Sequence, residues 1–520
     1  MRRLLVGILA LATIFGFCAV LPANASEQVP TARACTTPLH PGGPVCYTLI
    51  RTDITPLRAN ALRPDATPSG YGPSDLQSAY ALPSASAGSG QTVAVMEAAD
   101  NPNLESDLGT YRAQFGLPAC TTANGCFRKV NQSGQQGNYP PGDTGWGTEA
   151  SLDVDMISAI CPNCHILVVE AGDLNAAQNT AVSLGAHYLS NSWGTGDGSG
   201  DSGADADYNH AGVVDVASTG DSGYGVSFPA TSKYVVAAGG TSLNRSSSSR
   251  GWSETAWSGS GAGCSSWESK PSWQTDSGCG GNRTVGDVSA VADPGTGVAV
   301  YDTYGQGGWF VVGGTSASSP IIASTYALAA NPPSGPAAST LYANPGSLND
   351  VTSGSDGSCS PSYLCTAGGG YDGPTGLGTP NGLGAFGGTS SGGSAGPITG
   401  YSGLCVDDRS SSTTNFNPIQ IWGCNNSGAQ QWTVVAGGST LHVLGKCMDV
   451  NNGGTADGTT VDLYDCNGTG SQVFIPQSNG SLYNPQSGKC LDDPNSSTTE
   501  GTQLQLWDCN GTNAQQWHLP

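Results

Sequence analysis

Short apolar runs alternate with amphipathic stretches through the middle of the chain. The apolar runs are rich in β-branched residues, as in strands that are buried on both faces of a sheet. They span residues 91–96, 165–170, 187–192, 213–218 and 235–238. Helical patterns span residues 103–115, 149–160, 174–184 and 316–330. This alternation predicts an α/β fold in which a parallel sheet carries helices on both faces.

Two polar segments follow predicted strands. Asp221 comes just after the strand 213–218, and Ser316 opens a helix just after the apolar run 309–312. Reacting groups in parallel sheets collect at the carboxyl ends of the strands. We therefore expect Asp221 and Ser316 to lie at the same edge of this sheet.

A different pattern follows the Gly/Ser-rich stretch 387–397, whose composition predicts a flexible linker. Three cysteine pairs recur with a spacing of 19, and a Gln-x-Trp or Gln-x-Phe motif recurs at intervals of 42 and 43. A fixed period in three copies predicts a pseudo-threefold module. The pairs are Cys405 with Cys424, Cys447 with Cys466 and Cys490 with Cys509.

The first 25 residues have the features of a secretory signal. Arg2 and Arg3 precede an apolar run over residues 4–21, and small residues at 23–25 offer a cleavage site. The alternative is a membrane anchor, which the small-residue exit disfavours. We expect a secreted protein that has no membrane segment after signal cleavage.

Sixteen cysteines remain after removal of Cys18, and an even number in an exported chain predicts disulfides. Neighbour spacing favours four pairs besides those of the repeats: Cys35–Cys46, Cys120–Cys126, Cys264–Cys279 and Cys359–Cys365. Cys161-Pro-Asn-Cys164 is compatible with a redox or metal motif. Because it has no second cysteine pair nearby, a tight structural disulfide is the favoured interpretation.

Composition narrows the possible partners. The formal net charge is −22, and only 11% of residues are charged. Such an acidic chain lacks the basic face that nucleic-acid binding needs. As the pH falls, fewer of its carboxylates stay ionised to repel one another, which fits an acidic medium. We expect a monomer.

Three segments together indicate a serine hydrolase that uses no histidine. Ser316 lies in Gly-Thr-Ser-x-x-x-Pro, and a serine hydroxyl needs a neighbour that takes its proton. Glu149 and Asp153 are four apart on a predicted helix, where two close carboxyls can share a proton. Asp221, in Gly-Asp-Ser-Gly, can donate to an oxyanion only while it is protonated. Taken singly, the carboxylate pair is typical of a solvated helix face, and Gly-Asp-Ser-Gly of a turn.

These segments resemble the sedolisin family of serine-carboxyl peptidases. The segments Tyr71-Gly-Pro-Ser-Asp-Leu-Gln-Ser-Ala-Tyr80 and Asp287-Val-Ser-Ala-Val-Ala-Asp-Pro-Gly-Thr-Gly297 are similar to that family too, and the motifs keep its order over about residues 70–385. The resemblance implies a subtilisin-like fold and acid-acting endopeptidase or tripeptidyl-peptidase activity. It makes Ser316 the nucleophile, Glu149 the general base, Asp153 the residue that orients Glu149, and Asp221 the oxyanion acid. Glu97 and Trp193 match positions that extend the hydrogen-bond chain behind Asp153.

The same resemblance implies one structural Ca²⁺. Asp350 and Asp372 supply side-chain oxygens, and Val351, Gly368 and Gly370 supply carbonyl oxygens, the hard ligands that calcium prefers. Without the family, aspartates in glycine loops are more often turn formers. The chain departs from the family in its leader, because only about 45 residues separate the signal from Tyr71, which puts zymogen control in doubt.

The three C-terminal repeats resemble ricin-B-type lectin domains, which are β-trefoils. The Gln-x-Trp residues are expected to be core architecture. Sugar contacts are expected from an aspartate, a glutamine and an aromatic of each repeat: Asp407 with Gln420 and Trp422, Asp449 with Tyr464, and Asp492 with Gln505 and Trp507. The middle repeat has Asp462 where the others have glutamine, so the first and third repeats are the better candidates.

The sequence therefore predicts five parts: a signal (1–25), a short leader (26–70), a peptidase domain (71–386), a linker (387–397) and a lectin domain (398–520). We expect a secreted acid-acting serine-carboxyl endopeptidase that forms an acyl-enzyme with protein or peptide substrates. Its lectin domain is expected to bind carbohydrate or glycoprotein. The alternatives are a lectin with an inactive peptidase-like domain, and a glycoside hydrolase that uses the Glu149/Asp153 pair.

Overall fold

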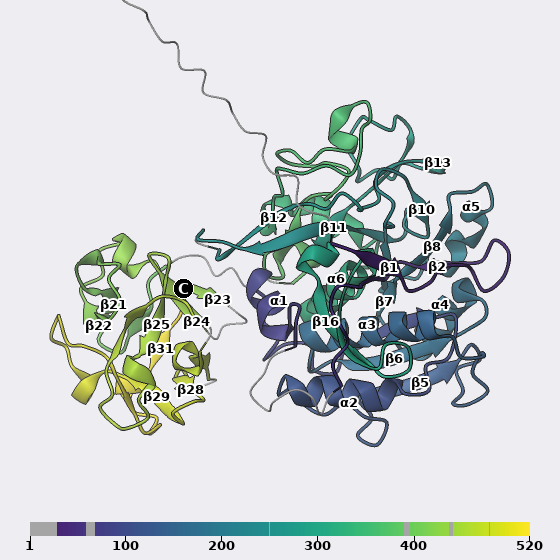
Figure 1. The fold of residues 1–520 in the computed structure, drawn as a ribbon. Coiled ribbons are helices and arrows are strands. Elements are labelled where there is room, and N and C mark those ends of the chain that lie inside the picture. The colour runs from purple at the N-terminus through teal and green to yellow at the C-terminus, as the bar shows by residue number, and fades with distance from the viewer. Residues whose placement is uncertain are drawn as a thin grey trace, which may run out of the picture.

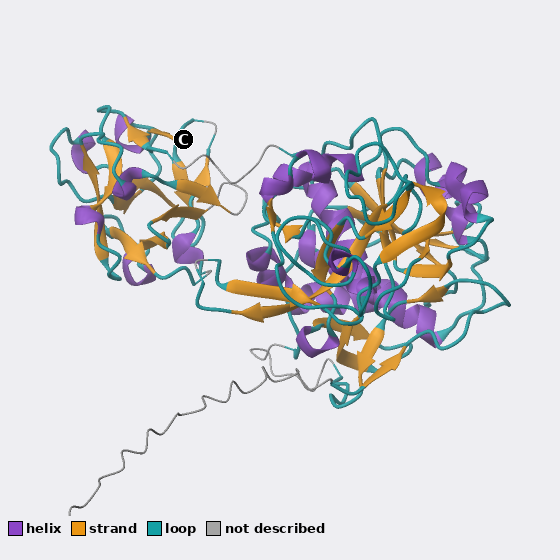
Figure 2. Ribbon diagram, turned by 90° about the horizontal axis from the view of Figure 1, so that it is seen from above, coloured by secondary structure: helices purple, strands orange, loops and turns teal. Residues whose placement is uncertain are grey.

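The computed structural model describes residues 29–58, 68–248, 250–388, 396–435, 440–467, 469–477 and 479–520. The predicted signal segment and most of the predicted linker lie outside these residues. Figures 1 and 2 show a larger body of helices and strands and a smaller body built of strands. The predicted fold class, α/β followed by an all-β trefoil, is confirmed.

An eight-stranded sheet forms the centre of the larger body. Its order is β12-β11-β9-β7-β4-β6-β5, with β15 paired to β11, and every pairing is parallel except that of β11 with β12. The strands are β4 (Thr92–Glu97), β5 (Phe127–Asn131), β6 (His165–Glu170), β7 (Tyr188–Asn191), β9 (Val214–Ser218), β11 (Val236–Arg245), β12 (Trp252–Ala256) and β15 (Val288–Val291).

Helices cover both faces of this sheet, as the apolar strands predicted. Alternate residues of β4 point to opposite faces. Val93 and Val95 join the core that includes α3 and α6, whereas Ala94 and Met96 join the core that includes α4. The helices are α1 (Pro73–Ala79), α2 (Leu104–Gln114), α3 (Thr144–Ile160), α4 (Leu174–Ser183), α5 (Asp201–Ala204), α6 (Thr315–Ala329) and α7 (Ala338–Ala343).

The apolar run before Ser316 was expected to be a strand of the parallel sheet, and this expectation was wrong. This strand, β17 (Gly308–Gly313), pairs antiparallel with β16 (Val298–Asp302) and with β3 (Leu49–Arg51). The connection from β16 to β17 spans only residues 303–307, and so short a connection joins antiparallel strands. The helix α6 still begins directly after the strand, as predicted.

The leader contributes strands to the larger body. β1 (Thr31–Arg33) pairs with β3, and β2 (Val45–Cys46) pairs with β8 (Trp193–Gly196), which also pairs with β10 (Ser227–Phe228). The hydrophobic pattern gave no indication of these short strands. Smaller antiparallel pairs are β13 (Gly263–Ser269) with β14 (Asn282–Val285) and β18 (Leu348–Asn349) with β19 (Thr379–Pro380).

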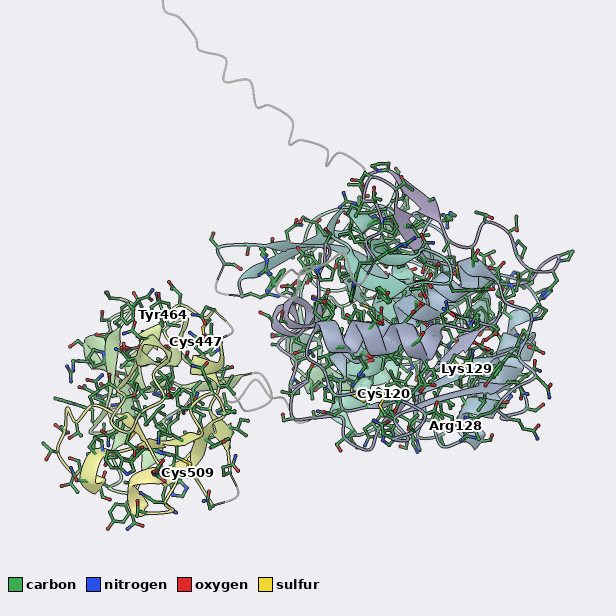
Figure 3. The ribbon with its side chains drawn as sticks, turned by 60° about the horizontal axis from the view of Figure 1, so that its bottom comes forward. Cys120, Arg128, Lys129, Cys447, Tyr464 and Cys509 are labelled. Atoms are coloured by element: carbon green, nitrogen blue, oxygen red, sulfur yellow. A yellow bond between two sulfur atoms is a disulfide. The ribbon has the colours of Figure 1, made fainter. Side chains whose placement is uncertain are left out.

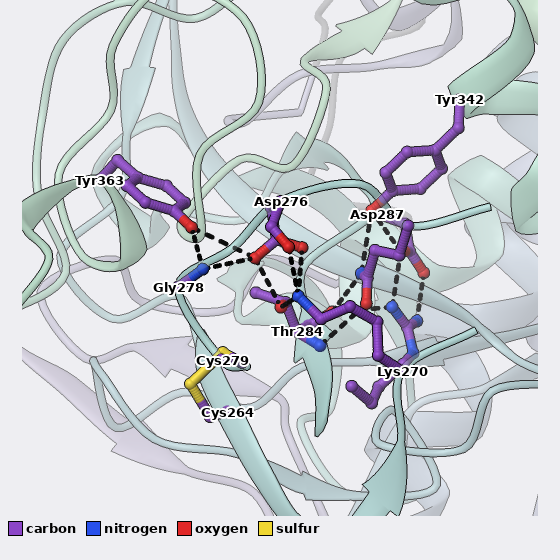
Figure 4. A network of polar contacts seen from close by, with 11 residues as sticks. Cys264, Lys270, Asp276, Gly278, Cys279, Thr284, Asp287, Tyr342 and Tyr363 are labelled. Carbon is purple, nitrogen blue, oxygen red and sulfur yellow. Dashed lines mark hydrogen bonds and ion pairs between the residues drawn. A yellow bond between two sulfur atoms is a disulfide. The ribbon is translucent and has the colours of Figure 1, made fainter. Parts of the chain in front are cut away.

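Polar and covalent links tie the outer loops to this core. The structure contains all eight predicted disulfides, including Cys161–Cys164. Arg283 and Asp287 form a fully buried ion pair at 2.5 Å. Tyr342 donates to the same Asp287 at 3.0 Å, and Asp276 links the neighbouring Tyr363 to this network (Figure 4). The loop closed by Cys359 and Cys365, which carries Tyr363, is thereby held against the sheet.

The smaller body is a trefoil with three matching hairpins. They are β21 (Cys405–Asp408) with β22 (Asn417–Trp422), β25 (Lys446–Val450) with β26 (Val461–Tyr464), and β29 (Lys489–Asp492) with β30 (Gln505–Trp507). Short strands complete it: β20 (Thr399–Gly400), β23 (Thr433–Val435), β24 (Thr440–Val443), β27 (Ile475–Pro476), β28 (Leu482–Asn484) and β31 (Trp517–His518). Cys447 and Cys509, each bonded within its own repeat, are labelled in Figure 3.

The Gln-x-Trp residues form the trefoil core, as expected. The indole of Trp432 donates to Val406 O at 2.7 Å, and that of Trp517 donates to Leu491 O at 3.0 Å. In the described parts of both bodies, no helix combines the length and the apolarity needed to cross a membrane.

Candidate active site

Ser316 lies in the first turn of α6, fully buried. Its hydroxyl donates to Ser192 O at 3.1 Å and accepts from the backbone N–H of Tyr47 at 3.1 Å. Gly314, which precedes the helix, has φ +100°, a conformation that side chains disfavour. A Cβ at position 314 would lie 1.8 Å from Tyr47 O and 2.7 Å from Asp221 Oδ2, so glycine is required there.

The proline of the Gly-Thr-Ser-x-x-x-Pro motif has a local role. Pro320 stands four residues after Ser316 inside α6 and has no N–H, so it cannot bond to Ser316 O as a helix normally would. Ser192 Oγ lies 3.2 Å from this free carbonyl oxygen and 2.7 Å from Asp153 Oδ1. Ser192 therefore connects the backbone of Ser316 to the carboxylate pair. The sequence analysis missed this residue.

The predicted carboxylate pair lies beside Ser316. Helix α3 begins at the N-cap Asp143 and packs against α6, which brings Glu149 and Asp153 beside Ser316, both buried. Glu149 Oε2 accepts from Thr48 Oγ1 at 2.8 Å. Burial raises the pKa of Glu149, Asp153 raises it further, and the nearby Ser316 hydroxyl lowers it.

Glu97 adds a third acid to this cluster. It ends β4, is buried, and lies close enough to Asp153 and Glu149 that their charges raise its pKa on top of burial. Both oxygens of Glu97, one of Glu149 and one of Asp153 are buried and lack a donor among the described residues. Acids packed in this way are tolerated when protons are shared between them.

The lysine that pairs with Glu170 also pairs outside the acid cluster. Lys129, labelled in Figure 3, pairs with Glu170 at 3.2 Å and with Asp100. Glu170 in turn is one of the charges that raise the pKa of Glu97. The cluster of Glu97, Glu149 and Asp153 therefore keeps its protons instead of pairing with a cation.

Asp221 lies on the other side of Ser316. Its Oδ1 accepts from the backbone N–H of Thr315 at 2.8 Å and from Thr315 Oγ1 at 2.9 Å. Its Oδ2 is buried without a partner among the described residues. Burial raises the pKa of Asp221 to about 7. The raised pKa favours the protonated carboxyl in acid, and its Oδ2 borders the space beside Gly314.

Trp193 does not make the hydrogen bond expected behind Asp153. Its indole nitrogen is buried and has no partner in the described parts of the chain. The backbone of Trp193 pairs with Cys46 of the leader instead. Ser192 fills the expected position in the chain of contacts.

Imidazoles take no part in this arrangement. All six histidines lie in described segments, and none forms a hydrogen bond with Ser316, Glu149, Asp153 or Asp221. Among the described residues beside Ser316, the side chains able to take a proton are carboxylates.

The predicted calcium residues gather around one glycine turn. The N–H of Gly368 donates to Asp372 Oδ2 at 2.9 Å, and the N–H of Gly370 donates to Asp350 Oδ2 at 3.0 Å. Burial raises the pKa of Asp372 to about 6, and the charge of Asp350 contributes. Val351 is buried next to Asp350. Two neighbouring carboxylates beside a glycine turn have the oxygen chemistry that a hard cation prefers.

The trefoil holds its predicted sugar residues in three equivalent places. In the first repeat, Asp407 Oδ1 accepts from Gln420 at 3.0 Å beside Trp422, which is 39% exposed, and the three line a cavity of about 680 Å³. In the third, Asp492 Oδ1 accepts from Gln505 at 3.0 Å beside Trp507, which is 41% exposed.

The middle repeat differs in the way its sequence predicted. Asp462 stands opposite Asp449 where the other repeats have glutamine, and the charge of Asp449 adds to burial to raise the pKa of Asp462 to about 7. Tyr464 packs its ring edge-to-face on Phe416 at 5.0 Å instead of lying free. The first and third repeats remain the better candidates.

Comparison with known proteins gives one result for each body. Residues 394–517 match the family model of the ricin-type beta-trefoil lectin domain. Kumamolisin of Bacillus sp. (strain MN-32) is 34% identical over 361 residues, which are 61% of this chain and 63% of that protein. Sedolisin of Pseudomonas sp. (strain 101) is 29% identical over 363 residues, 60% of each chain. The chain thus spans somewhat less than two thirds of the length of these relatives.

A solved structure extends the comparison to the fold. Pseudomonas sedolisin, a serine-carboxyl proteinase complexed with two molecules of pseudo-iodotyrostatin, is 27% identical, with a TM-score of 0.51. The match covers 61% of this chain and 96% of that chain.

The buried acids predict stability that is greatest in acid. A carboxyl whose pKa is raised by folding stabilises the protein below its unfolded pKa, near 4, and this stabilisation is lost as pH rises through the folded pKa. For Asp221 that loss runs from about pH 4, near its ordinary pKa, to about pH 7, its pKa in the folded protein. We expect the melting temperature at pH 4 to exceed that at pH 8 by at least roughly 5 °C.

Differential scanning calorimetry from pH 4 to pH 8 tests this expectation. Glu97→Gln removes one of the titrating groups and is expected to reduce the drop, whereas Asp508→Asn, at an exposed position, is not. A melting temperature that rises from pH 4 to pH 8 would contradict the shared-proton interpretation.

Proposed function

We propose that this protein is a secreted peptidase that is active in acid. We assign its larger body to the sedolisin family of serine-carboxyl peptidases and its smaller body to the ricin-type β-trefoil lectin domains. The observation that carries the proposal is the convergence of Ser316, Glu149, Asp153 and Asp221 in one buried site without an imidazole. Secretion is proposed from the signal-like first 25 residues and the eight disulfides.

The proposed reaction is acyl transfer to Ser316. Its oxygen attacks the substrate carbonyl while its proton passes to Glu149, which Asp153 and Ser192 hold in place. The oxyanion that forms takes a hydrogen bond from protonated Asp221. Glu149 then gives its proton to the leaving amine, and water hydrolyses the acyl-enzyme by the same steps.

The acid dependence follows from the direction of the pKa shifts. Asp221 is useful only while protonated, so activity is expected to fall as pH rises through about 7. A histidine base would be protonated and idle well below its usual pKa. Within the acid cluster one carboxylate can stay ionised while its neighbours hold protons, which keeps a base available in acid.

Ser316→Ala is expected to lower kcat/KM for peptides at pH 4 by at least about 10³-fold, because it removes the nucleophile. Ser324→Ala is the matched control, since Ser324 is buried in the same helix and its hydroxyl has no partner among the described residues. Hydrolysis of a peptide library, followed by mass spectrometry, measures both variants. Full activity in Ser316→Ala, or a wild-type optimum in alkali, would overturn the proposal. No peptide hydrolysis by a folded wild type would favour a lectin with an inactive peptidase-like domain.

We also propose a structural Ca²⁺ at the glycine turn. Asp350 and Asp372 would hold it through carboxylates, and Val351, Gly368 and Gly370 through carbonyls. The positive charge of the ion would offset the repulsion between the two neighbouring carboxylates and would so fix the turn.

Removal of the ion is expected to destabilise the fold. EDTA at pH 6 should lower the melting temperature of the wild type by roughly 5 °C or more, because a ligand that binds only the folded state stabilises it. Asp372→Asn, which weakens the site, should start lower and respond little to EDTA. Asp457→Asn, a surface substitution in the trefoil, should respond like the wild type. An EDTA-insensitive wild type would argue against the ion.

The trefoil is proposed to bind carbohydrate through its first and third repeats. Exposed indoles beside buried, hydrogen-bonded aspartates offer a stacking face and an acceptor for sugar hydroxyls. This would hold the peptidase near protein that is embedded in polysaccharide or carries glycans.

The double variant Trp422→Ala, Trp507→Ala is expected to weaken carbohydrate binding at least roughly tenfold, since both stacking faces are lost. Affinity electrophoresis in gels that contain soluble galactan, xylan or glycol chitin measures the change. Trp267→Ala is the control, because Trp267 is 55% exposed but lies on β13 of the larger body. If no polysaccharide alters the mobility of the wild type and no glycan on an array binds it, the trefoil would serve as a spacer only.

A further inference from the structure

Each of the three matching hairpins of the trefoil is completed by a residue from a neighbouring repeat. That residue donates its backbone N–H to the carbonyl just before the aromatic side chain of the hairpin. The three bonds are those of Phe416 to Leu463 O at 2.8 Å, Gly458 to Leu506 O at 2.9 Å and Gly501 to Ile421 O at 2.9 Å. Positions 416, 458 and 501 are therefore equivalent, and each borders the predicted sugar residues of another repeat.

Phe416 is the exception among these three positions. Its φ is +66°, a conformation that bulky side chains disfavour, whereas the two equivalent residues are glycines with φ +82° and +86°. A Cβ on Gly501 would lie 3.7 Å from the Trp422 ring, so the glycine leaves room beside that indole. Phe416 instead places a second ring against Tyr464, and this ring is 50% exposed. A bulky, exposed ring in a strained conformation indicates a role in binding.

The carboxyl groups beside these rings also differ from those of the other repeats. Asp462 lies two residues before Tyr464 on β26, so both side chains point to the same face. In the first and third repeats, a glutamine amide at the position of Asp462 donates to the opposite aspartate. Here Asp462 lies opposite Asp449, and its Oδ2 accepts from Asn451 at 2.7 Å. Its Oδ1 is buried and has no donor among the described residues.

The neighbouring polar side chains do not compensate for the second carboxyl. Lys446, on β25, forms its ion pair with Asp465, which follows Tyr464 on the exposed side. Gln472 lies within hydrogen-bonding reach of Asp449, as the corresponding glutamines do in the other repeats. Burial raises the pKa of Asp462 to about 7, and the charge of Asp449 contributes. A ligand that brings both a positive charge and hydrogen-bond donors would relieve this repulsion.

We propose that the middle repeat binds a protonated amino sugar, such as a glucosamine unit of deacetylated chitin, with the ammonium group at Asp449 and Asp462 and the apolar face of the sugar on Phe416 and Tyr464. An ammonium group offers three donors and no acceptor, which suits two carboxyls where the other repeats have one. The aromatic rings add the attraction between a cation and a ring face. This inference rests on the proposed carbohydrate binding and assigns the middle repeat a ligand class of its own.

The test is isothermal titration calorimetry of the full chain at pH 6 with two matched ligands, a glucosamine tetramer and its N-acetylated counterpart, which has no ammonium groups. The starting protein is the double variant Trp422→Ala, Trp507→Ala, so that the middle repeat alone keeps its hairpin aromatic. The glucosamine tetramer should bind this protein at least roughly tenfold more tightly than the acetylated tetramer, because charge-assisted hydrogen bonds are lost on acetylation.

Two further substitutions copy the other repeats and are therefore compatible with the fold: Asp462→Gln and Phe416→Gly. Each, added to the double variant, should weaken binding of the glucosamine tetramer at least roughly tenfold. Asp508→Asn removes the same charge as Asp462→Gln at an exposed position, where the side chain is 73% exposed. It should leave the affinity within about twofold, since exposed charges contribute little.

Three results would overturn the inference while carbohydrate binding by the first and third repeats stands. The two tetramers would bind alike, Asp462→Gln would weaken binding no more than Asp508→Asn does, or a lysine tetramer would compete as well as the glucosamine tetramer. The last result would mean that the middle repeat recognises a cation without the sugar. If no saccharide binds the folded wild type, this inference and the proposed carbohydrate binding fail together.

Discussion

Protons shared among buried acids are the constraint on which this site depends. Glu97, Glu149 and Asp153 lie together with several oxygens that have no donor among the described residues, and Lys129 pairs with Glu170 and Asp100. Three full charges in such a place would cost far more than a domain's stability. The cluster therefore favours protonated carboxyls, which stabilises the fold in acid. The proposed base, Glu149, belongs to the same cluster, so the stability in acid and the proposed chemistry share this origin.

Helix packing places that cluster beside Ser316. The contact of α3 with α6 sets the carboxylates against the serine, and Pro320 frees the Ser316 carbonyl so that Ser192 lies between the two helices' polar groups. Asp221 reaches the same serine from the end of β9, held by Thr315. The residues come from segments far apart in the chain, and backbone or hydroxyl contacts fix Glu149, Asp153 and Asp221.

The sequence predicted the parts of this arrangement that are encoded locally. The strand 165–170 was predicted to the residue, and α3, α4 and α6 to within a few residues, because their periodicity is long and regular. The pairing of β17 with β3 was missed, as was the partner of β2, since two- and three-residue strands are defined by long-range pairing. Ser192 and Tyr47 were missed for the same reason: nothing local distinguishes a serine or a tyrosine that a distant segment brings to a catalytic group.

The leader also changes the electrostatics of the site. The guanidinium of Arg33 lies close enough to Asp221 to lower its pKa, against the larger effect of burial. It therefore favours the ionised carboxyl, which cannot donate to an oxyanion.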